Sequence, residues 1–497
     1  MAENTLALPP LMDRLRPLLA TEEAPVFLVG GAVRDALLGR VTYDLDFVVP
    51  GAAIALAFRV GDALGAPAFV LDRERDIARV VLSDDTDLDF ARFRGADLEA
   101  DLRARDFTIN AMALPVQATT ASEIVDPCRG RVDLERGVIR LSYPEAMDDD
   151  AVRAMRAARL ALKLGFHLSP ETVEAVQQTA SHLQSVSVER VRDELIKALQ
   201  GPRAQEALPL LHRLHLLPQV LPEIAALEGV QQSAPHREPV LQHTVSILKW
   251  LARVERAVLD GEAEADLAQL EITVRLAPFA AGLRRHFERA VDGGLEGRVL
   301  LRLGALFHDV GKAETQTVEE NGRIRFLGHE QVGAEQAARR LRRLRLSNQA
   351  VRHVKEVVRG HMRPLWLAQE DRVSRRAVYR FFRALGDAGL DVGLISVADH
   401  LATHGGAGPE SDWERLLKVV EKLYTYYFEA YAQVVSPPPL LDGGELIAAL
   451  ELEPGPQVGE LLRLIEEAQA AGEIATPEEA IALAKRRRSQ STQQGPD

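Results

Sequence analysis

Two aspartates, Asp44 and Asp46, stand two positions apart in the apolar segment DLDFVV. Side chains alternate along a strand, so both carboxylates are expected on one face of a strand. Charge within an apolar strand is costly unless a cation offsets it. Asp89, in the segment DLDFARF, is the candidate third carboxylate, and Asp87 on the same face is the fallback. Three oxygen donors on adjacent strands predict a site for a hard ion such as Mg²⁺.

Gly30 and Gly31 precede this strand in the run LVGGAVRDALLGR. Glycines let the backbone approach a ligand closely, and the N–H groups that open a helix stabilise a triphosphate. Arg34, one turn further, is expected to reach a phosphate oxygen. With two divalent ions bound, one lowers the pKa of an attacking hydroxyl and the other neutralises departing pyrophosphate. These residues predict nucleotidyl transfer, by in-line displacement at the α-phosphate.

Arginines recur every third position after Asp150, at Arg153, Arg156 and Arg159, on a helix that we expect to begin near Asp148. Cytosine and adenine each present an amino donor beside a ring-nitrogen acceptor. A carboxylate accepts from the first and an arginine donates to the second, so one Asp/Arg pair can read both bases. Uracil and guanine place a carbonyl opposite the carboxylate, so two hydrogen-bond acceptors face each other, which is unfavourable in a dry pocket. The alternative is an amphipathic helix with ion pairs.

Apolar alternation predicts strands at 26–31, 44–49, 69–71, 78–82 and 87–93, with helices at 52–64 and about 99–114. This pattern indicates an α/β domain that ends near residue 140. From about residue 145 the apolar spacing is almost wholly helical. Breaks fall at Gly201-Pro202 and at 233–239, 404–410 and 436–444. The elements therefore predict an α+β protein of several domains.

Composition narrows the class of protein. The 497 residues exceed what one core holds, and the 46% hydrophobic and 27% charged residues are typical of a folded soluble chain. No apolar run reaches membrane-spanning length, and no secretory signal is recognisable, which predicts a cytoplasmic protein. Cys128 is the only cysteine, which excludes internal disulfides and cysteine zinc sites. The net charge of −13 argues against non-specific coating of nucleic acid, but a local basic groove can still bind RNA.

The run GGAVRD…DLD, followed by RARDFTINAMAL, DDDAVRAMRAARLALKLGF and VSVERVRDEL, resembles the class II tRNA nucleotidyltransferase and bacterial poly(A) polymerase family. The resemblance spans roughly residues 25–230, and more loosely the C-terminal stretch. It implies a polymerase-β-like nucleotidyltransferase head with a mixed sheet, then all-α parts. The implied domains are the head at 12–145, a helical neck and body at 146–232, an HD metal-dependent phosphohydrolase domain at 233–405, a helical tail domain at 406–485 and a disordered tail at 486–497.

Carried onto this chain, the family pattern makes Gly31 and Arg34 triphosphate contacts, Asp44 and Asp46 ligands of Mg²⁺, and Arg105 a nucleotide contact. It makes Asp150 and Arg153 the base-reading pair, with Arg156 and Arg159 holding the base and triphosphate. The segment ERVRDEL is expected to brace this helix. Two departures are Ala104, where the family has arginine, and Asp149, where it usually has glutamate.

A second set of residues resembles the HD phosphohydrolase pattern: His243, His308, Asp309, His329, His361 and Asp399. Imidazole and carboxylate groups from separate helices can hold one or two divalent ions. By resemblance the first site comprises His243, His308, Asp309 and Asp399, His329 and His361 support a second ion or the phosphate, and Lys312 binds substrate phosphate. Hydrolysis of 2′,3′-cyclic phosphates or phosphomonoesters would follow. The alternative is a helical scaffold without activity.

The family resemblance implies the tRNA 3′ end, CTP and ATP as partners, with no membrane and no DNA. The expected reaction is template-independent addition of CCA, or part of it, to tRNA. Only six residues lie between DFARFR and DLRARDF, and in the family a shortened connection is associated with CC-only addition. A poly(A) polymerase would share the same motifs. A further hypothesis is an HD hydrolase whose N-terminal half only docks RNA.

Overall fold

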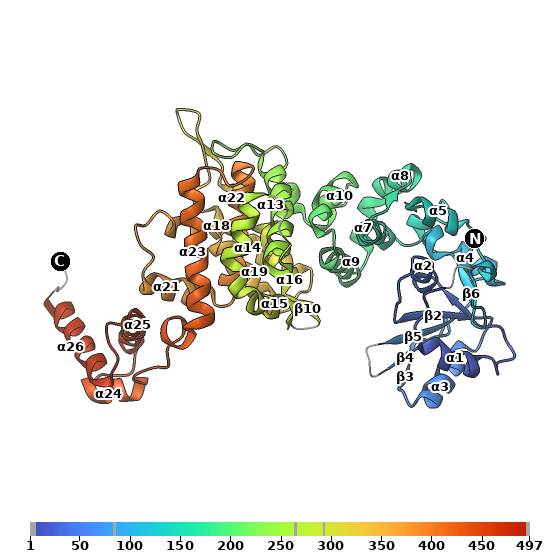
Figure 1. Ribbon diagram of the computed structural model, residues 1–497, viewed down its shortest axis with the longest axis horizontal. Coiled ribbons are helices and arrows are strands. Elements are labelled where there is room, and N and C mark those ends of the chain that lie inside the picture. Colours follow the sequence, from blue (N-terminus) through green and yellow to red (C-terminus); the bar gives the residue numbers. More distant parts are fainter. Residues whose placement is uncertain (1–5, 83–85, 263–265, 292–293, 494–497) are drawn as a thin grey trace. The chain divides into compact units, whose positions relative to one another are not determined.

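The computed structural model describes residues 6–82, 86–262, 266–291 and 294–493. These fall into two compact units (Figure 1). The first reaches Arg203 and includes Arg213–Gln219, and the second comprises Ala204–His212 and the described chain from Val220 onward. No helix among the described residues has the length and apolar character that crossing a membrane requires.

A mixed sheet forms the centre of the first unit. Its strands are β1 (Phe27–Val29), β2 (Asp44–Val49), β3 (Ala68–Asp72), β4 (Ile77–Val81), β5 (Asp87–Arg92) and β6 (Ala113–Pro115). They follow the order β3-β4-β5-β2-β1-β6, and β2 and β5 pair in parallel whereas the other neighbours are antiparallel. The predicted mixed sheet is confirmed, and β6 is a strand that the sequence pattern did not reveal.

Helices pack on this sheet and continue beyond it. They are α1 (Leu11–Leu19), α2 (Gly31–Leu37), α3 (Ala53–Leu64), α4 (Leu98–Arg103), α5 (Gly130–Arg136), α6 (Ala146–Asp149), α7 (Val152–Leu164), α8 (Pro170–Thr179) and α9 (Val188–Gln200), with a short β7 (Val138–Ile139) and β8 (His167–Leu168) pair. Helix α3 packs on β3, β4 and β5. Leu45 and Phe47 of β2 are at most 1% exposed, because alternation turns them into this core and leaves Asp44 and Asp46 on the other face.

Two predicted helices differ from the structure. The helix expected at about 99–114 is only α4, followed by a 3₁₀ turn (Thr108–Asn110) and by β6, because the backbone of β6 pairs with β1. The helix expected to begin near Asp148 begins at Val152, and Asp150 is extended with φ −156° and ψ 98°. The Asp150 side chain accepts from the Val152 N–H, which stabilises this break between α6 and α7.

The second unit is helical. Its elements, with those of the connecting segment, are α10 (Ala207–Arg213), α11 (Leu217–Val220), α12 (Pro222–Ala225), α13 (Val240–Glu255), α14 (Leu267–Leu276), α15 (Ala280–Glu288), α16 (Gly297–Phe307), α17 (Lys312–Thr315), α18 (His329–Arg343), α19 (Asn348–Gly360), α20 (Arg363–Leu367), α21 (Arg375–Leu385), α22 (Ala388–His404), α23 (Glu410–Glu429), α24 (Gly443–Leu450), α25 (Pro456–Ala471) and α26 (Pro477–Gln493). Short hairpins join β9 (Ala290–Val291) to β10 (Leu295–Glu296), and β11 (Thr317–Val318) to β12 (Ile324–Arg325).

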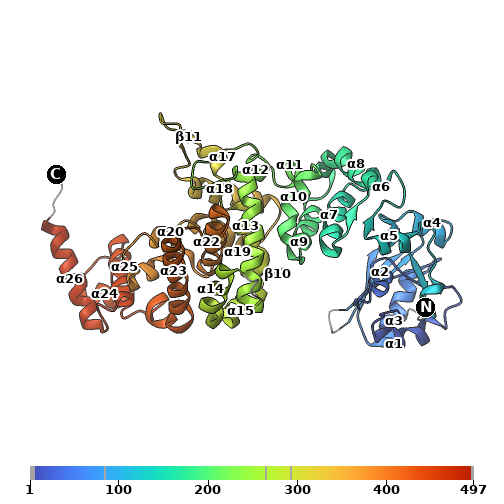
Figure 2. The same cartoon turned by 45° about the horizontal axis from the view of Figure 1, so that its top comes forward.

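Helix α22 is the central element of this unit, and α13, α16, α19 and α23 all pack against it (Figures 1 and 2). Its residues from Ala388 to Thr403 are buried around the whole circumference. Such a helix needs partners for any polar side chain that it carries. Helices α24, α25 and α26 share a separate apolar cluster. Helix α26 continues to Gln493 through most of the predicted disordered tail, and residues 494–497 lie outside the described residues.

Candidate functional site

Four carboxylates share one face of the paired strands β2 and β5. The register sets Asp44 beside Asp87 and Asp46 beside Asp89. Arg79 of β4 lies opposite Asp89, where its Nε and Nη2 donate to the two Asp89 oxygens at 2.7 and 2.8 Å. Its Nη1 donates to Asp87 at 2.7 Å. Two of the four negative charges therefore have an arginine partner.

The other two carboxylates lack such a partner. Among the described residues, no lysine, arginine or histidine forms an ion pair with Asp44 or Asp46. Burial, and then the neighbouring Asp44 carboxylate, raises the pKa of Asp46 to about 6. Burial and Asp89 also raise the pKa of Asp44. A divalent cation would offset this charge, so the donor set fits an ion of the Mg²⁺ class.

The glycine turn brings its backbone against this acidic edge. Gly30 has φ +72° and ψ −132°, a conformation that side chains disfavour. A Cβ there would lie 3.2 Å from Nη1 of Arg105 and 3.4 Å from Oδ2 of Asp46. Arg105 is anchored through Nε and Nη2 to Asp101, at 3.1 and 2.9 Å. The turn, the Arg105 guanidinium and the Asp46 carboxylate therefore surround one small space.

A chain of polar contacts leads away from the turn. Arg34 is 5% exposed, and it donates to Asp35 at 2.8 Å and to Asn110 at 2.6 Å. The Asn110 amide nitrogen donates to Asp106 at 3.1 Å. Asp106 accepts in turn from Arg156 at 2.9 Å. The head motif GGAVRD, the segment RARDFTIN and helix α7 are thus joined by side chains.

Helix α9 completes this chain. Arg159 donates to Glu194 at 2.5 Å, and Nε of Arg156 lies 3.5 Å from the same carboxylate. Glu194 is 7% exposed, so its charge is stabilised mainly by these two arginines. The segment ERVRDEL therefore braces α7, as the sequence predicts.

Asp150 and Arg153 do not bind each other. Asp150 accepts from Arg190 of α9 at 2.5 Å. Nη1 of Arg153 donates to the Tyr143 hydroxyl at 2.7 Å and to the Ala146 carbonyl at 3.0 Å. Because each side chain is oriented by a different neighbour, their polar ends can present an acceptor and a donor independently.

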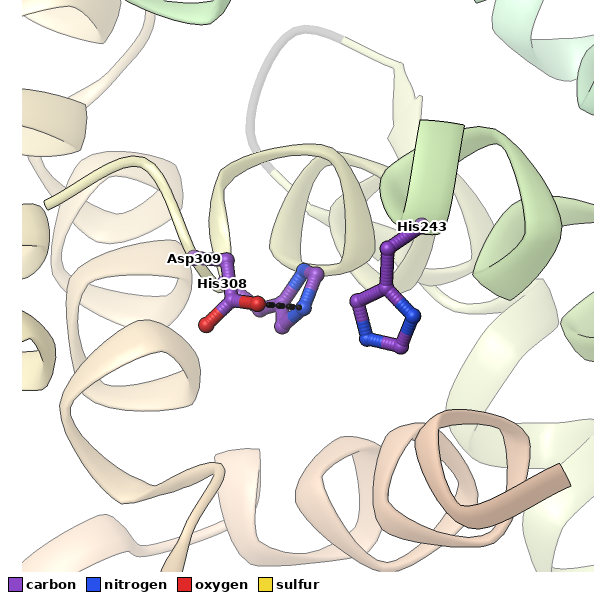
Figure 3. A group of neighbouring side chains, drawn as sticks. All are labelled: His243, His308 and Asp309. Atoms are coloured by element: carbon purple, nitrogen blue, oxygen red, sulfur yellow. Dashed lines mark ion pairs between the residues drawn. The ribbon is translucent and has the colours of Figure 1, made fainter. Parts of the chain in front are cut away.

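In the second unit, the HD set converges from separate helices. Figure 3 shows His243, His308 and Asp309 turned toward one another. Asp309 Oδ2 lies 3.0 Å from Nε2 of His308, and Asp309 Oδ1 lies 3.3 Å from Nε2 of His329. His361 Nε2 lies 3.7 Å from the same Oδ1. His243 Nε2 lies 3.0 Å from Asp399 Oδ1, which completes the set.

Backbone carbonyls orient three of these imidazoles. Nδ1 of His308, His329 and His361 donates to the carbonyl three residues earlier, at 2.8, 2.8 and 2.7 Å. In a neutral ring, Nε2 then carries a lone pair that faces the cluster. Burial, and then His329, lowers the pKa of His361 to about 3. The Nε2 atoms of His329 and His361 are only 3.3 Å apart, which fits a bound cation between them.

A cavity of about 770 Å³ opens beside this cluster and is lined by Asp309, His329 and Asp399. Lys312 also lines it, and its ammonium group lies 2.6 Å from Asp309 and donates to Gln232 at 2.7 Å. Arg323, Arg325 and Arg415 also line it, together with the acidic side chains Glu330 and Asp412, so the wall carries charges of both signs. Basic side chains next to imidazole and carboxylate ligands suit an anionic ester.

Three family models match the chain. The "Poly A polymerase head domain" matches residues 26–140. The "Probable RNA and SrmB- binding site of polymerase A" matches residues 165–227. A tRNA nucleotidyltransferase domain 2 model matches residues 319–484.

Two curated relatives match almost end to end. An A-adding tRNA nucleotidyltransferase of Deinococcus radiodurans is 36% identical over 96% of this chain and 98% of its own length. A CC-adding tRNA nucleotidyltransferase of Thermus thermophilus is 36% identical over 92% of each chain. The chain belongs to the class II tRNA nucleotidyltransferase family. A Thermotoga maritima CCA-adding enzyme solved with tRNA shares the fold of this tRNA nucleotidyltransferase, with a TM-score of 0.58, 19% identity and 96% of each chain covered.

The structure of this tRNA nucleotidyltransferase brings Gly30, Asp44, Asp46 and Arg105 to one edge of the head. Asp89 lies beside Asp46 but is held by Arg79. The guanidinium groups of the other predicted arginines are bound to protein groups: Arg34, Arg153, Arg156 and Arg159. Their predicted contacts with nucleotide stay predictions.

Several residues of this tRNA nucleotidyltransferase site were not predicted from the sequence. Asp106 and Asn110 lie within RARDFTIN, so the motif itself contained the signal. Arg79 stands in an apolar strand, where an isolated arginine signals a buried partner. His236 lines the cavity of the second unit, and it belongs to a segment whose composition indicates only a break between elements.

Proposed function

We propose that this tRNA nucleotidyltransferase adds C and A nucleotides, the CCA sequence or a part of it, to the 3′ end of tRNA from CTP and ATP. The observation that supports this proposal is the unbroken polar chain from the Gly30 turn to helix α7. That chain holds the acidic edge and the base-reading candidates in one compact unit.

In this mechanism Asp44 and Asp46 would hold divalent ions of the Mg²⁺ class. Such ions would activate the tRNA 3′ hydroxyl and neutralise the charge of the pyrophosphate. The N–H groups at the start of α2 bind the triphosphate, and Nη1 of Arg105 orients it, because it is the Arg105 nitrogen nearest the turn. Gly30 leaves room for the phosphate to approach.

Base selection is assigned to Asp150 and Arg153. The Asp150 carboxylate accepts from the amino group of cytosine or adenine, and the Arg153 guanidinium donates to the ring nitrogen. Arg190 holds the Asp150 carboxylate ionised, because the pKa of Asp150 is lowered by this contact against the opposing effect of burial. An ionised carboxylate can only accept, so it disfavours the carbonyl of uracil or guanine.

The connection between β5 and α4 is compact. A Cβ on Gly95 would lie 2.6 Å from the Ala100 Cβ, so this turn is tightly packed. In the family, a shortened connection at this place is associated with CC-only addition, so CC-only addition is the alternative to addition of the whole CCA sequence. One relative is named A-adding and the other CC-adding, so the assay must determine which of these nucleotides this chain adds.

The test offers single nucleotides with Mg²⁺ to tRNA that ends at the discriminator base and to tRNA that ends in CC. Incorporation of CTP into the tRNA that ends at the discriminator base, without incorporation of ATP into the tRNA that ends in CC, identifies CC addition. The reverse result identifies A addition. Incorporation of each nucleotide into its own tRNA identifies CCA addition. Arg153→Ala is expected to change base choice, whereas the exposed Arg136→Ala, its control, is not. Incorporation of UTP and GTP as readily as CTP and ATP would overturn the base-reading assignment. Absence of any incorporation would overturn the function.

We also propose that the second unit contains an HD-type phosphohydrolase site formed by the six predicted residues. The supporting observation is the set of Nε2 atoms directed at Asp309, beside a cavity whose lining includes Lys312 and three arginines. The substrate class is a 2′,3′-cyclic phosphate or a phosphomonoester. Lys312 and the cavity arginines bind its phosphate.

This second activity is tested with 2′,3′-cyclic nucleotides and aryl phosphates in a panel of divalent ions. His329→Gln is expected to remove hydrolysis and to leave nucleotide addition unchanged. The control is His167→Gln, an exposed histidine of the first unit. Equal hydrolysis by both variants would assign the activity elsewhere and leave the cluster as a scaffold.

We further propose a division into a head at 12–145, a neck and body at 146–232, an HD domain at 233–405 and a tail domain at 406–485, and a cytoplasmic location. The separate apolar cluster of α24–α26 supports a distinct tail from about residue 441 onward, whereas α23 packs against α22 of the HD domain. Limited proteolysis near residues 404–410 would test the boundary before the tail.

A further inference from the structure

A second histidine and aspartate cluster lies within the helical unit, apart from the six HD residues. His286 belongs to α15, His353 to α19 and Asp391 to α22. His286 Nε2 lies 2.7 Å from Asp391 Oδ2, and His353 Nε2 lies 3.2 Å from the same oxygen. The three side chains are 5%, 9% and 0% exposed. Three separate helices therefore direct two imidazoles at one buried carboxylate.

Hydrogen bonds within the protein leave this cluster incomplete. His353 Nε2 and Asp391 Oδ1 are both buried, and neither has a hydrogen-bond partner among the described residues. An unsatisfied polar atom in such a place is costly. A cation bound to His353 Nε2 and to the Asp391 carboxylate would satisfy both groups, whereas hydrogen bonds to Oδ2 leave Oδ1 without a partner.

We propose that His286, His353 and Asp391 form a structural site for a transition-metal ion of the zinc class. The donors are two imidazole Nε2 atoms and the Asp391 carboxylate. The two oxygens of one carboxylate are too close together to fill two corners of a tetrahedron, so the carboxylate fills one position and a water molecule would fill the fourth. In a tetrahedral zinc site such donors are about 3.3 Å apart, given metal–ligand distances of about 2.0–2.2 Å. The observed 3.2 Å already meets this spacing, and the 2.7 Å contact requires a small shift of His286.

The position of this cluster suggests what the ion does. His353 precedes His361 by eight residues along the chain, and Asp391 precedes Asp399 by the same eight. Eight residues of α-helix rise about 12 Å. This ion would therefore lie about that far from the HD cluster, toward the N-terminal ends of the same two helices. By joining α15, α19 and α22 it would fix the helices that present His361 and Asp399. These residues are positioning residues and touch no substrate.

Metal analysis of the full-length protein tests the proposal. The protein is stripped with a chelator, dialysed against limiting Zn²⁺ and measured for zinc per chain. His353→Gln is expected to lose one equivalent and to lose the rise in Tm that Zn²⁺ gives the wild type at this site. His329→Gln, in the HD cluster, is expected to lose zinc independently, so that the double variant loses both amounts. His167→Gln, exposed in the first unit, is expected to lose none.

A second variant keeps the test decisive if His353→Gln fails to fold. His353→Cys replaces one zinc ligand with another, a thiolate. With Co²⁺ it is expected to show a thiolate-to-metal charge-transfer band in the near ultraviolet. The wild type, whose only thiol is Cys128, is expected to lack this band. Unchanged zinc content in His353→Gln, or no such band in folded His353→Cys, would show a hydrogen-bonded triad instead and overturn the proposal.

Discussion

Asp46 and Asp309 are carboxylates in the two candidate metal sites, and their surroundings shift their pKa values in opposite directions. Burial raises the pKa of Asp46 to about 6, and the adjacent Asp44 adds to this effect. Asp309 is also buried, but His308 and Lys312 overcome burial and hold its pKa well below the ordinary value. The contrast shows that, for two buried carboxylates, the charges of the neighbouring groups decide the direction of the pKa shift.

The two candidate metal sites also differ in the types of ligand that they offer. The edge of the head offers only oxygen donors and is partly open, which suits a hard ion that exchanges with a nucleotide. The helical cluster offers imidazoles whose orientation is fixed by backbone carbonyls, which suits an ion held between reactions. One chain can therefore contain two metal sites with different ions and different exchange.

The largest expected effect separates the two sites by activity. Asp46→Asn removes a charge that we propose binds the ions, so nucleotide addition is expected to fall at least about a hundredfold. Hydrolysis at the helical cluster is expected to stay unchanged. Single-turnover extension of tRNA measures the first and cyclic-nucleotide hydrolysis the second. The control is the exposed Asp62→Asn on α3. A parallel loss of both activities would show that the two sites do not act independently.

The second-largest expected effect is on the stability of the protein in the presence of a metal chelator. Asp309→Asn leaves His308 and Lys312 facing each other without the buried carboxylate between them. We expect a loss of about 3 kcal/mol in the free energy of unfolding, typical of a broken buried pair. Urea unfolding measures it, with the exposed Asp371→Asn as control. If the two variants unfold at the same urea concentration, the cationic surroundings do not stabilise Asp309.

A pair of glycines tests the geometry of the acidic edge. Gly30 and Gly39 have similar φ values of +72° and +70°, but a Cβ on Gly39 would meet nothing within 4 Å. Alanine at either position is expected to cost roughly 1 kcal/mol of backbone strain. Gly30→Ala is expected also to lower nucleotide addition about tenfold, because its Cβ crowds Arg105 and Asp46. Equal activity of the two variants would remove Gly30 from the site.

The smallest effect is a pH dependence of the metal-free protein. The pKa of Asp46 is about 6 when folded, against an ordinary value of 3.8, so the folded state binds the proton more tightly. Stability contributed by this group falls as pH rises from about 4 to about 6 and stays low above it. The free energy of unfolding of Asp46→Asn is therefore expected to exceed that of the wild type at pH 7, by about 1 kcal/mol after allowance for partial exposure. This advantage is expected to vanish near pH 4, and a constant difference would contradict the assignment.

Much of the head could be predicted from its pattern. Alternation identified β2 and β5, and the carboxylates at every second position identified their shared face. β6 was missed because its three residues carry no alternation and their strand geometry comes from pairing with β1. The start of α7 was misplaced because the break at Asp150 depends on contacts of its side chain.

The amino-acid order alone specifies the chemical types along the chain, namely the acidic pair, the arginine series and the six HD residues. Strand alternation and motif spacing are local properties, so they are visible without a fold. Folding adds the facts that Arg79 neutralises Asp89, that Asp106 links Arg156 to Asn110, and that Asp391 faces two histidines. Those contacts join residues far apart in sequence, and the free energy of a buried charge depends on which groups folding brings beside it.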